Sequence, residues 1–336
     1  MADYAGVRVL VTGADGFIGS HLVERLAAGG AKVTALALYN AFDSHGWLDE
    51  LPAPMRASVR IERGDVRDAA LVLRLCRDQE VVFHLAALIA VPYSYGAAQS
   101  YIDVNVTGAV NLLEAARAHA PRRVVMTSTS EVYGTARRTP IDEDHPLRGQ
   151  SPYAASKIAA DAIAEAYALS FALPVVVLRP FNTYGPRQSE RAVIAAAIRQ
   201  ALDPDCAEIR LGDLSPSRDF TFIADTVAAF AAAGSAEGLA YGVPYNAGTG
   251  VALSIEQVVE VIRRLVGTNK PVVEEAVRRR PAGSEVLALL ADSTRFSAAA
   301  GWRAETGLDQ GLALTVEWWR ERLARGAVRA ASGFIT

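Results

Sequence analysis

Apolar and polar positions follow two alternating patterns along the first two-thirds of the chain. Short β-branched, apolar runs, such as residues 7–12, predict buried strands. In the segments between them, apolar residues recur at helical spacing, for example at Ile18, Leu22 and Leu26. This alternation predicts an α/β fold, a doubly wound parallel sheet with helices on both faces. The predicted strands span 7–12, 32–38, 59–62, 81–85, 124–127 and 175–178, and the predicted helices 17–28, 69–77, 98–119 and 153–171.

The pattern changes after Pro180. Turn-rich stretches at 182–187 and 213–217 separate shorter elements. We expect this part to form a smaller C-terminal α/β lobe over the carboxyl edge of the sheet. Its predicted helices span 191–201, 255–266 and 312–323.

Composition narrows the class of protein. Of the 336 residues, 51% are hydrophobic, which excludes a disordered chain. A net charge of −3 argues against a partner that is a nucleic acid or an anionic membrane surface. No apolar run is long enough to span a bilayer, and the N-terminus lacks the order of a signal peptide. Cys76 and Cys206 have no neighbouring Cys or His, so we expect a cytoplasmic protein without a metal site.

A glycine-rich turn lies between the first predicted strand and helix. Gly13, Gly16 and Gly19 allow a tight turn there and let backbone N–H groups approach a pyrophosphate at the helix N-terminus. In this strand–turn–helix context the motif predicts a dinucleotide site. The alternative is a tight turn without a ligand.

The adenosine end of this predicted site lacks the usual ribose-binding acid. The strand 32–38 ends without Asp or Glu, and no Arg or Lys follows that could meet a 2′-phosphate. NAD is therefore favoured over NADP. Asp65 follows the third strand, where it can reach the adenine amino group, or it can cap the next helix.

Candidate catalytic groups gather after the fifth predicted strand. Residues 128–134 end that strand with several hydroxyls, at the edge where open α/β sheets place ligands. The next helix begins with Tyr153 and Lys157, which share one helix face because they are four residues apart. An ammonium beside a phenol stabilises the phenolate, so Tyr153 can accept a proton.

These motifs resemble the extended short-chain dehydrogenase/reductase family, which includes nucleotide-sugar epimerases and dehydratases. The segments 179–187, 218–221, 280–285 and 301–312 resemble family segments too. The resemblance implies a Rossmann-type NAD-binding domain (1–181 and 216–250) and a nucleotide-sugar-binding lobe (182–215 and 251–326). The implied cofactor-binding residues are Gly13, Gly16, Phe17, Ile18, Gly19, Asp65, Val66, Leu85, Ala86, Ala87, Tyr153, Lys157 and Pro180.

Glu131 separates the reactions known in this family. A C4 epimerase needs Tyr153, Lys157 and the hydroxyl of Thr129, and has no use for a carboxylate beside the sugar. A 4,6-dehydratase needs a base for the C5 proton, and Glu131 stands where the dehydratases carry it. Where many hexose dehydratases have Asp this chain has Ser130, so Glu131 serves C6 as well or Ser130 orients it. Uronic-acid decarboxylases share the 128–134 motif, which leaves that reaction open.

Other segments favour dehydration of a nucleotide-linked N-acetylglucosamine. Residues 38–42, 46–49, 88–95 and 186–193 look like the 4,6-dehydratases of legionaminic-acid pathways. In the family, two Ala-rich helices pair across a homodimer, which we expect here for 98–119 and 153–171. The remaining alternative is a catalytically idle NAD-binding regulator. The resemblance implies substrate contacts from Tyr93, Ser94, Thr129, Asn182, Arg187, Arg218 and Arg280.

Overall fold

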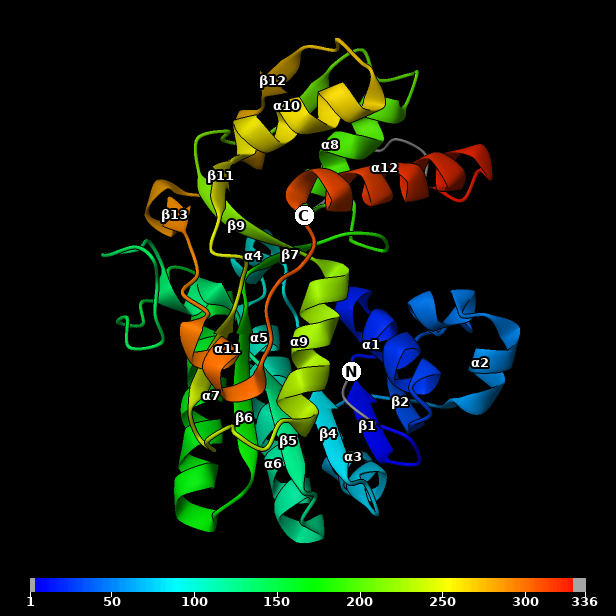
Figure 1. Cartoon of the computed structure of the whole chain (residues 1–336), viewed down its shortest axis with the longest axis vertical. Helices are drawn as coiled ribbons and strands as arrows, with labels where there is room; N and C mark the ends of the chain where they lie inside the picture. Colours follow the sequence, from blue (N-terminus) through cyan, green and yellow to red (C-terminus); the bar gives the residue numbers. More distant parts are fainter. Residues whose placement is uncertain (1–3, 329–336) are drawn as a thin grey trace.

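The computed structural model describes residues 4–328, and its larger part is built on one seven-stranded sheet (Figure 1). Every pair of neighbouring strands in this sheet is parallel. The first strand lies inside the sheet and the chain crosses over it to reach the fourth, as in a doubly wound Rossmann-type sheet. The predicted fold class is confirmed. In sheet order the strands are β10 (Pro244–Ala247), β6 (Val175–Pro180), β5 (Arg123–Thr127), β4 (Val81–His84), β1 (Arg8–Thr12), β2 (Lys32–Leu38) and β3 (Arg60–Gly64).

Helices cover both faces of the sheet, and its side chains supply two apolar cores. Val9 and Val11 of β1 belong to one core, while Leu10 between them belongs to the other. All three side chains are fully buried, which explains why this strand is apolar at consecutive positions. One face carries α1 (Phe17–Ala28) and α9 (Ile223–Ser235), and the other carries α3 (Ala69–Cys76), α6 (Gly108–His119) and α7 (Pro152–Phe171).

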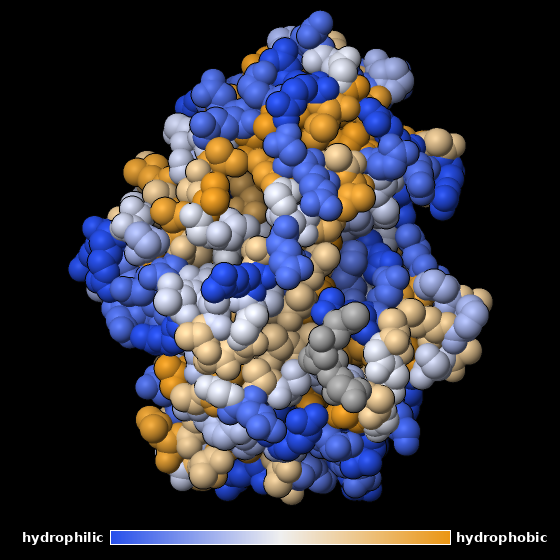
Figure 2. Space-filling model, in the orientation of Figure 1, coloured by the Kyte–Doolittle hydropathy of each residue, from blue (hydrophilic) through white to orange (hydrophobic). Residues whose placement is uncertain are grey.

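A smaller lobe lies over the carboxyl ends of these strands (Figure 1). The face drawn in Figure 2 is a mixture of hydrophilic and hydrophobic residues, with apolar residues visible in its upper part, where this lobe lies. One of these helices begins with a capping box formed by Ser254 and Gln257. The elements of the lobe are β7 (Asn182–Tyr184), β9 (Ser217–Phe222), β11 (Ala252–Ser254), β13 (Ala288–Leu289), β8 (Ile209–Leu211), β12 (Val272–Glu274), α8 (Val193–Leu202), α10 (Ile255–Val266) and α12 (Leu308–Ala324).

The predicted single helix over 98–119 differs from the structure. It is divided by a π-helical segment, η2 (Ile102–Thr107). There the side chain of Asn105 hydrogen-bonds both the backbone N–H and the backbone carbonyl of Leu88, at 2.8 and 2.9 Å. The remaining short elements are η1 (Gly46–Glu50), α2 (Ala53–Ser58), α4 (Val91–Ser94), α5 (Ala98–Tyr101), η3 (Ser130–Tyr133), η4 (Ala276–Arg278), η5 (Ala282–Ser284) and α11 (Thr294–Ala300).

The chain returns from the lobe to the large sheet within the range 216–250. β9 pairs with β7, β11 and β13, so it belongs to the sheet of the lobe. The next two elements, α9 and β10, pack on or join the seven-stranded sheet. The crossing point therefore lies at the start of α9, a few residues after the predicted boundary at 216. None of the helices within residues 4–328 is long and apolar enough to cross a membrane.

Candidate active site

The glycine-rich turn joins β1 to α1, and at Gly13 and Gly19 the backbone has no room for a side chain. Gly13 has a positive φ of 66°, and a side chain there would come within 2.7 Å of the backbone nitrogen of Ala86. A side chain at Gly19 would clash with the carbonyl oxygen of Gly13. No side chain caps the first turn of α1, so its N–H groups stay available to an anion. This turn fits the pyrophosphate of a dinucleotide.

Small residues follow β4 beside this turn. The N–H of Ala86 donates to the hydroxyl of Thr12 at 3.2 Å, and the same hydroxyl lies 2.9 Å from Nδ1 of His84. Burial lowers the pKa of His84 to about 3. His84 is therefore neutral at physiological pH, and its Nδ1 shares a hydrogen bond with the Thr12 hydroxyl. The predicted contacts Leu85, Ala86 and Ala87 come directly after it, partly buried.

Asp65 is not the N-cap of the helix that follows. The cap of α3 is Asp68, which accepts a hydrogen bond from the N–H of Leu71 at 3.1 Å. The carboxylate of Asp65 instead pairs with Arg67 at 2.6 Å, and this contact lowers its pKa. The capping alternative is wrong. The other predicted cofactor contacts lie around the turn and sheet edge: Phe17 and Ile18 in α1, Val66 before α3, and Pro180 at the end of β6.

The Tyr–Lys pair opens α7, and both side chains are buried. The ammonium of Lys157 donates to the carbonyl of Thr127 at 2.6 Å, and burial lowers the pKa of Lys157 to about 8. Burial raises the pKa of Tyr153, while a hydrogen bond with the Thr129 side chain opposes that rise. Below about pH 8 the chain thus holds a charged ammonium one helical turn from a protonated phenol.

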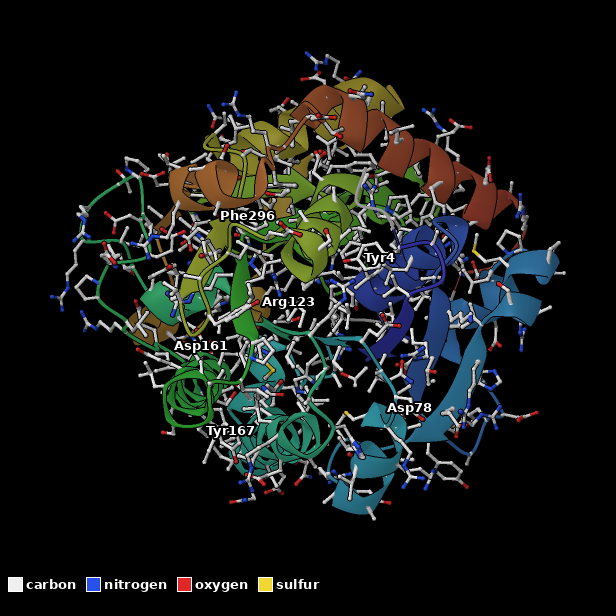
Figure 3. All side chains as sticks on the ribbon, turned by 60° about the horizontal axis from the view of Figure 1, so that its bottom comes forward. Tyr4, Asp78, Arg123, Asp161, Tyr167 and Phe296 are labelled. Carbon is white, nitrogen blue, oxygen red and sulfur yellow. The ribbon has the colours of Figure 1, made fainter. Side chains whose placement is uncertain are left out.

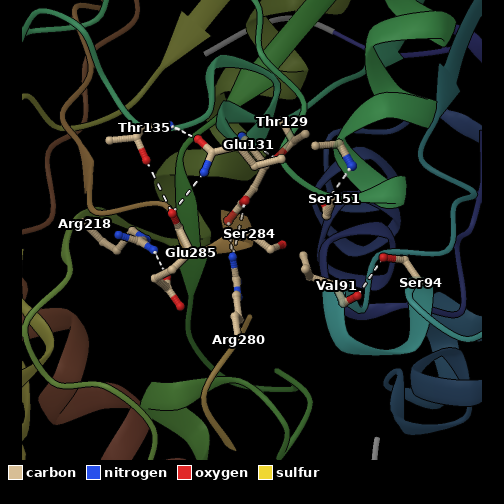
Figure 4. A network of polar contacts seen from close by, with 12 residues as sticks. Val91, Ser94, Thr129, Glu131, Thr135, Ser151, Arg218, Arg280, Ser284 and Glu285 are labelled. Atoms are coloured by element: carbon tan, nitrogen blue, oxygen red, sulfur yellow. Dashed lines mark hydrogen bonds and ion pairs between the residues drawn. The ribbon is translucent and has the colours of Figure 1, made fainter. Parts of the chain in front are cut away.

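The end of β5 brings a carboxylate to this pair. Thr129 is the N-cap of η3, and its hydroxyl accepts a hydrogen bond from the N–H of Glu131 at 3.2 Å. Ser130 and Glu131 are both buried. The guanidinium of Arg280 lies 3.3 Å from the Glu131 carboxylate (Figure 4). The structure therefore assembles all five predicted catalytic residues around the start of η3 and α7.

A second arginine lies beside this carboxylate. Arg218 is 6% exposed and pairs with Glu285 at 3.0 Å (Figure 4). Burial lowers the pKa of Arg218, whereas the carboxylates of Glu131 and Glu285 act against that shift. Burial also disfavours charge on Arg280, yet the same two carboxylates raise its pKa overall. Two guanidinium groups thus lie close to Glu131 at the strand end, a donor set that is able to bind a diphosphate.

The remaining predicted substrate contacts are more dispersed. Tyr93 is 45% exposed on α4, whereas Ser94 is buried and donates to the carbonyl of Val91 at 2.6 Å. Asn182 begins β7, and its side-chain oxygen is buried without a partner among residues 4–328. Arg187 pairs with Glu24 of α1 at 2.8 Å, so its guanidinium ties the lobe to the glycine-turn helix.

Three buried polar residues behind the site, Asp161, Arg179 and Asn105, were not predicted from the sequence. Arg179 binds Asp161 through two nitrogens, at 3.0 and 2.9 Å, and Ser128 donates to the same carboxylate at 2.7 Å. Figure 3 shows Asp161 on α7. Asn105 donates to Ser156 next to the Tyr–Lys turn. Asp161 could have been predicted, because it follows Lys157 by four residues and so lies on the same helix face. No pattern in the sequence marks the π segment that positions Asn105.

Comparison with known proteins identifies the family of enzymes to which the chain is related. The profile described as GDP-mannose 4,6 dehydratase matches residues 10–315. A UDP-glucose 4-epimerase of Mycolicibacterium smegmatis is 36% identical over 94% of this chain and 99% of its own length. A dTDP-glucose 4,6-dehydratase of Streptomyces griseus is 35% identical over 93% of this chain and 94% of its own. The solved structure of an NAD-dependent NDP-hexosamine 5,6-dehydratase of tunicamycin biosynthesis has a TM-score of 0.81 and 32% identity, covering 94% of this chain and 98% of that one.

Fold and site together define an NAD-dependent enzyme of the extended short-chain dehydrogenase/reductase class that acts on nucleotide sugars. The chain belongs to the GDP-mannose 4,6-dehydratase family, whose relatives include dehydratases, epimerases and decarboxylases. Solved structures of relatives contain NAD, which confirms the predicted cofactor. The closer relation to legionaminic-acid enzymes stays a prediction.

Proposed function

We propose that the protein is an NAD-dependent 4,6-dehydratase that converts a nucleotide-linked N-acetylglucosamine to its 4-keto-6-deoxy form. The observation that supports this reaction is the buried carboxylate of Glu131, adjacent to Thr129 and held by Arg280. A hexosamine dehydratase among the solved relatives supports the sugar class.

The first step is oxidation at C4, for which NAD, when bound, supplies the hydride acceptor. Tyr153 accepts the proton of the C4 hydroxyl as the hydride leaves, and Thr129 hydrogen-bonds the same oxygen. Tyr153 is protonated in the protein alone, so its activation depends on positive charge. Lys157 provides that charge from the next turn of α7, where its ammonium is anchored on the Thr127 carbonyl.

Glu131 carries the second step. The C4 ketone acidifies the C5 proton, and the Glu131 carboxylate removes it as the C6 hydroxyl leaves. Ser130 is a poor acid, so the proton that Glu131 takes from C5 passes to the leaving hydroxyl and departs in water. The ion pair with Arg280 orients the carboxylate for both atoms. To complete the reaction, hydride from the cofactor, when bound, would return to C6 while Glu131 delivers a proton to C5, and that proton balances the one that Tyr153 took from the C4 hydroxyl.

Substituting Glu131 separates this reaction from the alternatives. In Glu131→Gln, Tyr153 and Lys157 remain, so C4 oxidation still reduces the cofactor, which absorbance records in a single turnover. Loss of water should slow by about 10²-fold or more because general base catalysis is removed. Glu285→Gln is the matched control: it removes a carboxylate from the same cluster, and water loss should continue.

A C4 epimerase is the second candidate, favoured by the identity to UDP-glucose 4-epimerases. An epimerase would need Tyr153, Lys157 and Thr129 and would be indifferent to the carboxylate. Unimpaired turnover in Glu131→Gln would therefore remove Glu131 from the mechanism and favour epimerisation.

We also propose that the enzyme is a homodimer paired through α6 and α7. The C-terminal end of α7 exposes two large apolar side chains, Leu169 at 77% and Phe171 at 49%. Both helices are rich in alanine, which allows close helix approach. Light scattering of the purified protein tests this, and a monomer mass would contradict it.

A further inference from the structure

The end of β2 lacks an acid of its own, but the glycine-rich turn delivers one to it. The side chain of Asp15 projects from that turn, and the N–H of Leu38, the last residue of β2, donates to its carboxylate at 3.3 Å. Leu38 is followed by Tyr39 and Asn40. A carboxylate therefore lies at the strand end although no acid follows the strand in the sequence.

The loop after β2 closes on Asp15 and fixes its position. The N–H of Trp47 donates to the backbone oxygen of Asp15 at 3.1 Å. Gly46 has a φ of 57°, and a side chain there would come within 2.6 Å of that oxygen. Gly46 and Trp47 thus pack directly against the backbone of Asp15.

The Asp15 carboxylate has acceptor capacity left over. A carboxylate offers about four lone-pair positions. The contacts that lower the pKa of Asp15 are backbone N–H groups and His45, while burial dominates and raises it. Hydroxyl groups could donate hydrogen bonds to the remaining acceptor positions of the carboxylate, and a ribose carries two neighbouring hydroxyls.

The neighbouring cation is already neutralised. Arg63 of β3 is aligned with Ala37 of β2, and its guanidinium pairs with Asp43 at 2.6 Å and donates to His45 at 3.1 Å. A phosphate at this strand end would be repelled by the Asp15 carboxylate. Arg63 would not offset this repulsion, because its guanidinium is already paired with Asp43.

We propose that Asp15 determines cofactor specificity. Its carboxylate accepts hydrogen bonds from the adenosine ribose hydroxyls of NAD and repels the 2′-phosphate of NADP. Asp15 thereby replaces the acid that β2 lacks.

Competition binding to the full-length protein tests this role without catalysis. ADP and 2′-deoxy-ADP are titrated against bound NADH, whose fluorescence reports displacement. Wild type should bind the deoxy compound about tenfold more weakly, because a hydrogen bond to a charged acceptor is lost. Asp15→Ala and Asp15→Asn should reduce that ratio below about threefold and weaken discrimination against NADP by about tenfold.

Asp43→Asn is the matched control, since Asp43 is a carboxylate of the loop that follows β2 and is largely exposed. It should keep the wild-type ratio. Asp15→Asn retains an acceptor for the Leu38 N–H, so thermal unfolding should show it folded. A wild-type ratio near one, an unchanged ratio in folded Asp15 variants, or a loss of the ratio in Asp43→Asn would each overturn the proposal.

Discussion

His84 makes the stability of the protein depend on pH in a calculable way. It lies 4% exposed at the end of β4, where its Nδ1 is hydrogen-bonded to the Thr12 hydroxyl, and burial lowers its pKa from 6.5 to about 3. Between these values the unfolded chain binds a proton that the folded chain does not. The contribution of His84 to the free energy of unfolding is therefore fully present above pH 6.5 and is lost progressively as the pH falls below that value. From about pH 7.5 to about pH 5 the loss is about 2 kcal/mol, at 1.36 kcal/mol for each pH unit below 6.5.

Urea unfolding of wild type and His84→Asn at both pH values measures this loss. Carboxyl groups with a raised pKa, such as Asp15 and Glu143, act in the opposite direction, but they are present in both proteins and cancel in the comparison. The variant should be less sensitive to acid than wild type by about 2 kcal/mol. Thr12→Val is the control: it should lose stability equally at both pH values. The same pH sensitivity in wild type and His84→Asn would refute the reasoning.

Two further substitutions test the site and the contact between lobes. Lys157→Met should slow reduction of the cofactor by about 10³-fold, and the fall in wild-type rate above about pH 8 should be absent from the variant; a stopped-flow rate within tenfold of wild type would contradict this. Arg322 lies 4.8 and 4.9 Å from the rings of Trp47 and Trp318 and pairs with Glu50 at 2.9 Å, which joins α12 to η1. Arg322→Ala should lower the free energy of unfolding by about 1–2 kcal/mol and change tryptophan fluorescence, and an unchanged urea midpoint would contradict it.

The parallel sheet was predictable because its strands and helices have different periods. Residues 17–28, 32–38 and 255–266 match α1, β2 and α10 residue for residue. The π segment was not predictable, since it coincides with a tertiary contact of Asn105 with Leu88 that no local pattern reveals. The position of β9 likewise depends on its pairing with β7 and β11 across the lobe.

The residues of the candidate site were predictable where the catalytic groups are close together in the sequence. Tyr153 and Lys157 share a helix face, and Thr129 and Glu131 share a strand end. The partners of those groups come from distant segments: Arg280 reaches Glu131 across 149 positions. Asp15 could not be recognised from the sequence, because its proximity to Leu38 exists only after β1 and β2 pair.

Mass spectrometry of the products tests the central claim most directly. The purified protein is incubated with UDP- and GDP-N-acetylglucosamine, the corresponding hexoses and UDP-glucuronate. We predict a product lighter by one water from an N-acetylglucosamine nucleotide, which would also identify the nucleotide. Loss of carbon dioxide from the glucuronate, or an unchanged mass with an altered sugar NMR spectrum, would contradict the dehydratase proposal and leave Glu131 with a different role.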